Sequence, residues 1–170
     1  NDNTYYKAYN EIENIRSILR NSEETISITD FGAGSFKFNS NTRKIKDIVK
    51  YTSVSKKFGQ LLYRMVKYFN PKVIVELGTS IGISTMYMAR GNEKSKIISI
   101  EADKNLSESA GLNFNNAGLS NITVINDSFE NALPGIIKST DEKLFVFIDG
   151  NHNKESTLQY YNQFITKPEN

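Results

Sequence analysis

The second half of the chain alternates short apolar runs with helical segments, and this rhythm constrains the fold more than any other feature. Four runs are typical of strands, at Val73–Leu77, Lys96–Glu101, Ile122–Ile125 and Leu144–Asp149. Helical patterns follow them at Ile83–Arg90, Asp103–Ala117, Ser128–Lys138 and Glu155–Ile165. Because strands that alternate with helices pair in parallel through right-handed crossovers, the sequence predicts an α/β fold with an open, doubly wound parallel sheet.

Residues 1–70 show helical patterns without such strands, and they predict a helical N-terminal cap in front of a sheet domain at residues 71–170. The apolar spacing indicates three helices, over Thr4–Arg20, Thr42–Tyr51 and Ser55–Phe69. Between the first two, Asn21–Asn41 lacks a sustained period and contains the glycine-bearing segment Asp30–Ser35. We expect that segment to be either a plain connecting loop or a lid over a substrate pocket.

Composition excludes several classes of protein. The chain of 170 residues has the size of one domain, and it has no cysteine, which excludes a disulfide scaffold and fits a reducing compartment. Its 21 Lys and Arg residues nearly balance 19 Asp and Glu residues, which does not suit an electrostatic nucleic-acid binder. No apolar run approaches the roughly 20 residues that span a bilayer, and residues 1–20 lack the pattern of a signal peptide. We therefore expect a cytoplasmic protein without nucleic-acid or membrane partners.

Polar or glycine-rich positions come directly after each of the four strands. They are Glu76–Gly82, Glu101, Asp127 and Asp149. In a doubly wound sheet, ligands bind beyond the carboxyl ends of the strands, where the strand order reverses. We therefore expect these positions to form one site. Four suitable strand ends together are a more specific signal than any one of them alone.

The turn after the first strand reads Glu76-Leu77-Gly78-Thr79-Ser80-Ile81-Gly82. Gly78 and Gly82 permit a tight turn and let a ligand approach the backbone. A dinucleotide-binding fingerprint would have a further glycine where Ser80 stands, and the Glu76 carboxylate would repel a pyrophosphate. The pattern favours a ligand with a cationic amino group, although an ordinary strand-to-helix turn would leave the same pattern.

The later strand ends indicate a nucleoside beside that turn. A carboxylate at Glu101 can accept both hydroxyl groups of a ribose, and Asp127 with Ser128 could hydrogen-bond an adenine. The alternatives are a solvated strand end for Glu101 and a helix cap for Ser128. Asp149 stands where reacting groups would meet, or it serves the local turn. His152 is the one histidine of the sequence, and it belongs either to this site or to the surface.

The segment from Glu76 to Ser84, with the polar residues after the later strands, resembles the class I S-adenosylmethionine-dependent methyltransferases. It is most similar to the small-molecule O-methyltransferases of the catechol and caffeoyl-CoA type. Gly59-Gln60 and Met88-Ala89-Arg90 match the same family, and the likeness covers residues 52–161. The resemblance implies a Rossmann-like fold, S-adenosylmethionine as cofactor and methylation of a small molecule, with oxygen as the first choice of acceptor atom.

The resemblance also implies roles for individual residues, transferred position by position. The methionine part of the cofactor would be held at the first turn and the helix behind it, by Glu76, Gly78, Thr79, Ser80, Gly82 and Ser84. The nucleoside would be held by Glu101 and Ala102 at the ribose and by Asp127 and Ser128 at the adenine. Thr52, Ser53 and Val54 match a segment that closes over the cofactor, with Ser53 as its binding residue.

The catalytic positions depart from the family pattern. Asp149 matches a magnesium ligand of the catechol-type enzymes, and His152 stands where those enzymes carry a lysine that takes the proton of the substrate hydroxyl. We expect His152 or Asp149 to take that proton here. The other metal ligands would come from a fifth strand, so Asp149 alone makes an incomplete site and the use of Mg²⁺ stays open.

The resemblance carries further expectations about the chain as a whole. The family's sheet has three strands beyond the four identified here, so we expect either a chain truncated at its C-terminus or, as the alternative, a naturally reduced member of the family. A homodimer stays open. Two other functions stay open. One is a nicotinamide-dependent dehydrogenase, which the missing middle glycine opposes. The other is a non-catalytic cofactor-binding or interaction domain, which the lack of the remaining metal ligands favours.

Overall fold

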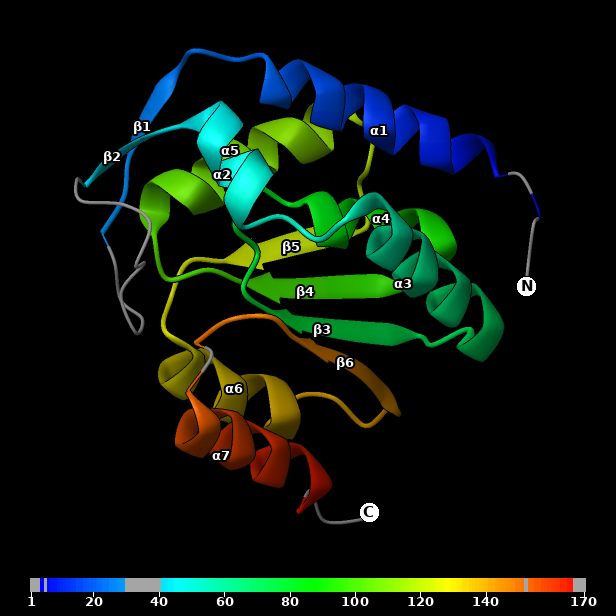
Figure 1. Ribbon diagram of the computed structural model, residues 1–170. Coiled ribbons are helices and arrows are strands. Elements are labelled where there is room, and N and C mark those ends of the chain that lie inside the picture. The colour runs from blue at the N-terminus through cyan, green and yellow to red at the C-terminus, as the bar shows by residue number, and fades with distance from the viewer. Residues whose placement is uncertain (1–3, 5, 30–40, 152, 167–170) are drawn as a thin grey trace.

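Helices cover both faces of a parallel sheet (Figure 1). The computed structural model describes residue 4 and residues 6–29, 41–151 and 153–166. One face carries α1 (Lys7–Arg20), α2 (Ile45–Tyr51), α3 (Lys56–Phe69), α4 (Ile83–Gly91) and α5 (Lys104–Asn116). The other face carries α6 (Phe129–Lys138) and α7 (Lys154–Ile165). The layered α/β architecture predicted from the sequence is confirmed.

The sheet consists of β3 (Val73–Leu77), β4 (Lys96–Ile100), β5 (Ile122–Ile125) and β6 (Leu144–Ile148), in the spatial order β5-β4-β3-β6. All three strand pairs are parallel. The chain moves outward from β3 through β4 to β5, and it then returns to the opposite side of β3 as β6. The strand order therefore reverses between β3 and β6, which is where a doubly wound sheet binds its ligands.

Burial along the strands explains why the sequence identified them. Every residue of β3 is buried, because helices cover both faces and strands flank both edges, and this produces a continuous apolar run. Strand β6 is half-buried along its whole length. Among the described strands it pairs only with β3. We predicted the strands ending at Glu101 and Asp149 one residue too long.

A short antiparallel hairpin corrects the prediction for the N-terminal region. Strand β1 (Thr25–Ser27) pairs with β2 (Thr42–Lys44), and Ile26 lies opposite Arg43. We expected no element within Asn21–Asn41 and a helix from Thr42, and both expectations were wrong. Strands of three residues are too short to show the alternation that identifies a strand. The predicted loop or lid at Asp30–Ser35 lies outside the described residues.

The N-terminal helices share their core with the sheet. Tyr9 and Ile12 of α1 and Ile48 of α2 belong to the same buried cluster as Met86 of α4 and Ile97 of β4. A second cluster fills the opposite face, between the sheet and α6 and α7. The division into a cap at residues 1–70 and a sheet domain at residues 71–170 stays a prediction. None of the helices in the described part of the chain is long and apolar enough to cross a membrane.

Candidate functional site

The turn between β3 and α4 is held against β4 by its own backbone. The amides of Gly78 and Thr79 both donate to the Ile100 carbonyl, at 3.0 and 3.2 Å, and the Ser80 amide donates to Glu101 Oε2 at 2.8 Å. The φ angles of Gly78, Ser80 and Gly82 are 101°, 50° and 87°. Three successive backbone N–H groups of the turn thus donate hydrogen bonds to acceptors within the protein. A pyrophosphate-binding turn instead presents its N–H groups to the ligand.

Gly78 brings this turn into contact with the end of β6. A β-carbon at Gly78 would lie 3.0 Å from the carbonyl carbon and oxygen of Asp149 and 3.0 Å from the amide nitrogen of Gly150. The Asp149 amide also donates to the Leu77 carbonyl at 2.9 Å. The predicted site residues Gly78 and Asp149 therefore meet at the reversal of strand order, as the spacing of strand ends indicated.

Glu76 lies below the turn in a fully buried cluster of hydroxyl groups. Its side chain is 0% exposed. Ser84 donates to Oε1 at 2.6 Å, and Ser99 and Thr85 donate to Oε2. The Ser99 hydroxyl also lies 2.6 Å from the hydroxyl of Thr79. The partners of Glu76 and Ser84 are thus groups of the protein that tie β3 to β4 and α4, and their direct contact with a ligand stays a prediction.

Burial also changes the acidity of this carboxyl group. Desolvation raises the pKa of Glu76 from 4.5 to about 7, although the hydroxyls of Ser84, Ser99 and Thr85 favour the charged form. The negative charge of Asp149 raises the pKa further. Burial therefore brings the charge change of the Glu76 carboxyl group close to neutral pH.

Glu101 places an oriented carboxylate at the end of β4, next to the turn. Its Oε2 accepts the Ser80 amide at 2.8 Å, and its Oε1 accepts the Asp103 amide at 3.0 Å. Burial raises the pKa of Glu101, whereas the amides of Asp103 and Ser80 lower it. The Asn126 side chain donates to the carbonyls of Glu101 and Ala102, at 2.9 and 3.0 Å. The ends of β4 and β5 are thereby joined.

Asp127 and Ser128 begin α6, and both make capping contacts. The Ser128 hydroxyl accepts the Asn131 amide at 3.3 Å, while Asp127 Oδ1 accepts the Ser128 amide at 2.7 Å and the Asn131 side chain at 3.0 Å. The capping alternative considered from the sequence is therefore present. Since Asp127 is exposed and Ser128 half-buried, a ligand contact is compatible with the cap and stays a prediction.

The segment of residues 52–54, between α2 and α3, lies beside the turn. The Thr52 hydroxyl is 3.4 Å from the Ser80 hydroxyl. The Val54 carbonyl accepts Arg16 Nη1 at 2.8 Å. The Ser53 hydroxyl oxygen is buried and has no hydrogen-bond partner within the described part of the chain. Ser53 is therefore a predicted binding residue with a buried hydroxyl that lacks a partner among the described residues.

Sequence reasoning missed two buried charged residues that border this region. Arg16 holds Val54, and its position four residues after the buried Ile12 was the available signal. Asp103 caps α5 by accepting the Leu106 amide at 2.8 Å, and it also accepts the Thr29 amide at 2.6 Å. The second contact anchors the end of β1 near the carboxyl end of β4. No local sequence pattern predicts the contact between Asp103 and Thr29.

The structure describes only one of the two residues that were predicted for catalysis and metal binding. Asp149 is half-buried at the end of β6, and His152 lies outside the described residues. No group of three or more acidic or histidine side chains that could hold a metal occurs among the residues that the structure describes. Asp149 is therefore not part of such a group, and its role as a magnesium ligand stays a prediction.

Known proteins give an independent view of this fold. The family model described as a methyltransferase domain matches residues 75–168. The O-methyltransferase from Bacillus cereus, solved in complex with SAH, has a TM-score of 0.65 and 19% identity over 98% of this chain and 63% of its own. TomG from Streptomyces achromogenes, involved in tomaymycin synthesis and solved with SAM, has a TM-score of 0.63 and 18% identity over 96% and 61% of the two chains.

A third solved structure, the SAH-bound methyltransferase PaMTH1 from Podospora anserina, has a TM-score of 0.67 and 17% identity over 97% of this chain and 58% of its own. The chain thus spans less than two thirds of the length of these three structures. No curated protein matches it in sequence. The structural likenesses support the fold, and the family model covers more than half of the residues, including the turn after β3 and the ends of β4, β5 and β6. The chain therefore belongs to the methyltransferase-domain family.

Proposed function

We propose that this chain binds S-adenosylmethionine across the carboxyl ends of β3 and β4 and methylates an oxygen atom of a small molecule. The observation that carries the proposal is the pairing of the glycine turn with the oriented carboxylate of Glu101. Membership of the methyltransferase-domain family supports it. So do the S-adenosylmethionine and S-adenosylhomocysteine bound to structures of the same fold.

The chemistry of the site fits the nucleoside of this cofactor. Each oxygen of the Glu101 carboxylate accepts one backbone amide, which leaves each with a further lone pair for a ribose hydroxyl. Because the two amides fix the carboxylate beforehand, little ordering is needed when a diol binds. Glu101 would hold the ribose, Ala102 would lie beside it, and Asp127 and Ser128 would border the adenine.

The turn fits the methionine part better than it fits a phosphate. The amides of Gly78, Thr79 and Ser80 are already donated to β4, so they offer no cradle to a pyrophosphate. The backbone of Asp149 lies against Gly78, and the negative charge of Asp149 acts on Glu76, so the acidic character of this region suits a cationic amino group. The same features count against the dehydrogenase alternative, because a nicotinamide dinucleotide carries two negative charges at this position.

S-adenosylmethionine supplies a sulfonium methyl group, which a nucleophile can take in line. The chain's part in catalysis would be to hold the acceptor oxygen against that methyl group and to keep water away. We propose that His152 or Asp149 takes the proton of the acceptor hydroxyl. The proposal includes no step that involves Mg²⁺, because no group of three acidic or histidine side chains that could hold the ion occurs among the residues that the structure describes.

Three further properties belong to the same proposal. A small-molecule acceptor is supported by the O-methyltransferases among the similar structures. A cytoplasmic location is supported by the absence of cysteine from the sequence. A homodimer is proposed from the resemblance to the small-molecule O-methyltransferases alone, and sedimentation would test it.

Isothermal titration of the chain with S-adenosylhomocysteine and with NADH tests the cofactor assignment. We expect S-adenosylhomocysteine to bind and NADH not to bind. Glu101→Gln should weaken S-adenosylhomocysteine binding about tenfold or more, since it removes a charged acceptor and turns an amide group toward a backbone N–H. Glu142→Gln, at an exposed position far along the chain, is the control and should bind like the wild type.

Two results would contradict the cofactor assignment. They are binding of NADH in preference to S-adenosylhomocysteine, and unchanged affinity in a folded Glu101→Gln variant. Transfer of a labelled methyl group from S-adenosylmethionine to small hydroxylated aromatic compounds then separates an enzyme from the non-catalytic alternative. Tight cofactor binding without any transfer would favour that alternative.

A further inference from the structure

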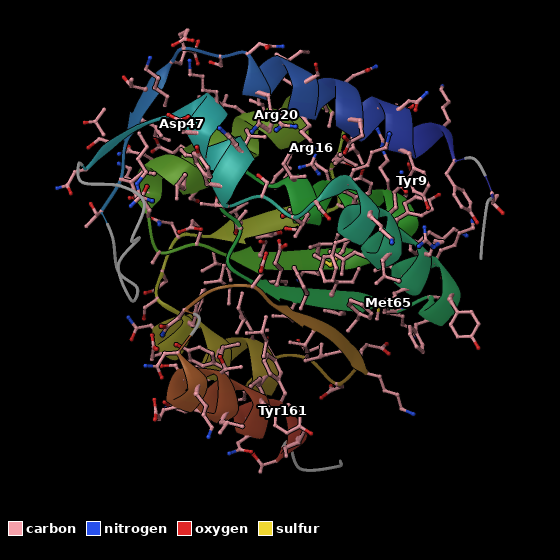
Figure 2. The ribbon with its side chains drawn as sticks, in the orientation of Figure 1. Tyr9, Arg16, Arg20, Asp47, Met65 and Tyr161 are labelled. Carbon is pink, nitrogen blue, oxygen red and sulfur yellow. The ribbon has the colours of Figure 1, made fainter. Side chains whose placement is uncertain are left out.

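Arg16 is a buried charged residue on a helix that the proposed site does not include. It lies on α1 and is 7% exposed, whereas Arg20, one turn further on, is exposed (Figure 2, where both are labelled). Its Nε donates to Glu13 Oε1 at 2.9 Å, and its Nη1 donates to the Val54 carbonyl at 2.8 Å. Its Nη2 is buried and has no hydrogen-bond partner within the described part of the chain.

Helix α4 is linked to the guanidinium group through Glu13. The hydroxyl of Tyr87, a fully buried residue of α4, donates to Glu13 Oε1 at 2.7 Å, the same oxygen that accepts Arg16 Nε. Hydrogen bonds therefore run from α4 through Glu13 and Arg16 of α1 to the backbone of Val54. Since α4 begins directly after the turn, both sides of the connection lead back to the proposed site.

The segment that Arg16 reaches lies against the turn. Thr52 approaches Ser80, and the Ser53 hydroxyl between Thr52 and Val54 is buried without a partner in the described residues. A buried hydroxyl without a partner costs free energy unless a ligand or water completes it. Because Val54 and Ser53 are adjacent, a hydrogen bond to the Val54 carbonyl also restricts where the Ser53 side chain can lie.

Stability alone does not account for an arginine at this position. Burying a guanidinium with one nitrogen unpaired is unfavourable, and apolar side chains of similar size often replace buried ion pairs at no loss of stability. Methionine would fill the same face of α1 without a desolvation cost. A hydrogen bond to the Val54 carbonyl, by contrast, requires a long side chain that ends in a donor, and arginine provides one.

We propose that Arg16 is a positioning residue, which fixes residues 52–54 against the turn of residues 78–82 so that Ser53 is in place for the cofactor. This rests on the proposed binding of S-adenosylmethionine at that turn. Arg16 itself touches neither cofactor nor substrate in the proposal. It acts through the backbone of Val54, and its effect is on the fraction of molecules whose segment is ready to bind.

Arg16→Met tests the proposal, with Arg20→Met as the matched control on the same helix. Hydrogen exchange of the amides of residues 52–54, measured without ligand, should become faster in Arg16→Met and stay unchanged in Arg20→Met. Affinity for S-adenosylhomocysteine should fall about tenfold in Arg16→Met, as expected if one molecule in ten keeps the segment in place. Arg16→Lys keeps the charge but has one donor nitrogen where arginine has three, and it should recover part of both effects.

The outcomes separate positioning from stability and from the proposed function. Lower thermal stability of Arg16→Met with unchanged exchange and affinity of the folded chain would overturn the positioning role. If Arg16→Met does not fold, wild-type behaviour of a folded Arg16→Lys in both measurements would overturn it too, because a single ammonium nitrogen lacks the separate Nε and Nη1 donors that reach Glu13 and Val54. Failure of the wild type to bind S-adenosylhomocysteine would overturn the proposed function instead, while the exchange comparison would still decide the role of Arg16.

Discussion

At the scale of single residues, the buried carboxyl group of Glu76 couples stability to pH. Three hydroxyl groups donate to it, yet desolvation dominates and raises its pKa from 4.5 to about 7. The folded chain therefore holds this proton more tightly than the unfolded chain does. The resulting stabilisation is complete below pH 4.5 and is lost as the pH rises through about 7.

Replacing Glu76 by glutamine should remove this dependence, because an amide stays neutral at every pH. Relative to the wild type, Glu76→Gln should gain stability between pH 5 and pH 8, by an amount on the order of 3 kcal/mol if the whole shift is expressed. Urea unfolding at several pH values measures the difference. Glu108→Gln, on the exposed surface of α5, should leave the pH dependence of the wild type unchanged.

A constant stability difference between Glu76→Gln and the wild type over this range would show that Glu76 stays charged in the folded chain. In that case its three hydroxyl partners, and not desolvation, would control its protonation.

At the scale of elements, the approach of the turn after β3 to the end of β6 depends on Gly78. Gly78→Ala should destabilise the chain by about 1–3 kcal/mol, because its φ of 101° is unfavourable for alanine and its β-carbon would press on the backbone of Asp149 and Gly150. Backbone atoms cannot move aside as a flexible side chain could. Thermal unfolding measures the change in stability.

Gly111→Ala provides the matched comparison in α5. A β-carbon there would meet no heavy atom within 4 Å, and the residue lies inside a helix. We expect this variant to gain up to about 1 kcal/mol, because alanine is the better helix former. Equal effects of the two substitutions would mean that the contact between Gly78 and the end of β6 contributes nothing to stability.

Prediction from the sequence succeeded where the apolar or glycine pattern lies within the residues of the element itself. The residues of β3 are buried on both faces and therefore form an unbroken apolar run, and Gly78 and Gly82 mark the turn that follows. The hairpin of β1 and β2 went unpredicted because three residues are too few to show alternation.

The contacts of Arg16 and Asp103 were unpredictable for a different reason. The Arg16 side chain bonds a carbonyl 38 positions away, and Asp103 accepts an amide 74 positions away. Nothing in the residues around either position encodes such a partner. The sequence therefore predicted strand ends that lie together at the candidate site, and it left out the buried charged residues that contact the segments around them.

At the scale of the whole molecule, the N-terminal helices and the sheet bury one common surface. Ile12 of α1 is 2% exposed, and it belongs to the same cluster as Ile97 of β4 and Met86 of α4. A cap that folded apart from the sheet would leave both of these surfaces exposed to water. The common core therefore favours one cooperative unit over separate domains divided near residue 70.

Hydrogen exchange in increasing urea tests this for the wild type and for Ile12→Ala. In each protein, the amides of α1 and of β4 should lose protection at the same urea concentration. Ile12→Ala should lower that shared concentration, since it removes a buried side chain at a cost of about 2–5 kcal/mol. Ile18→Ala, at a position of α1 that is 71% exposed, should change stability by less than about 0.5 kcal/mol. Earlier loss of protection in α1 than in β4 would instead show that α1 unfolds while the sheet stays intact, and it would contradict a single cooperative unit.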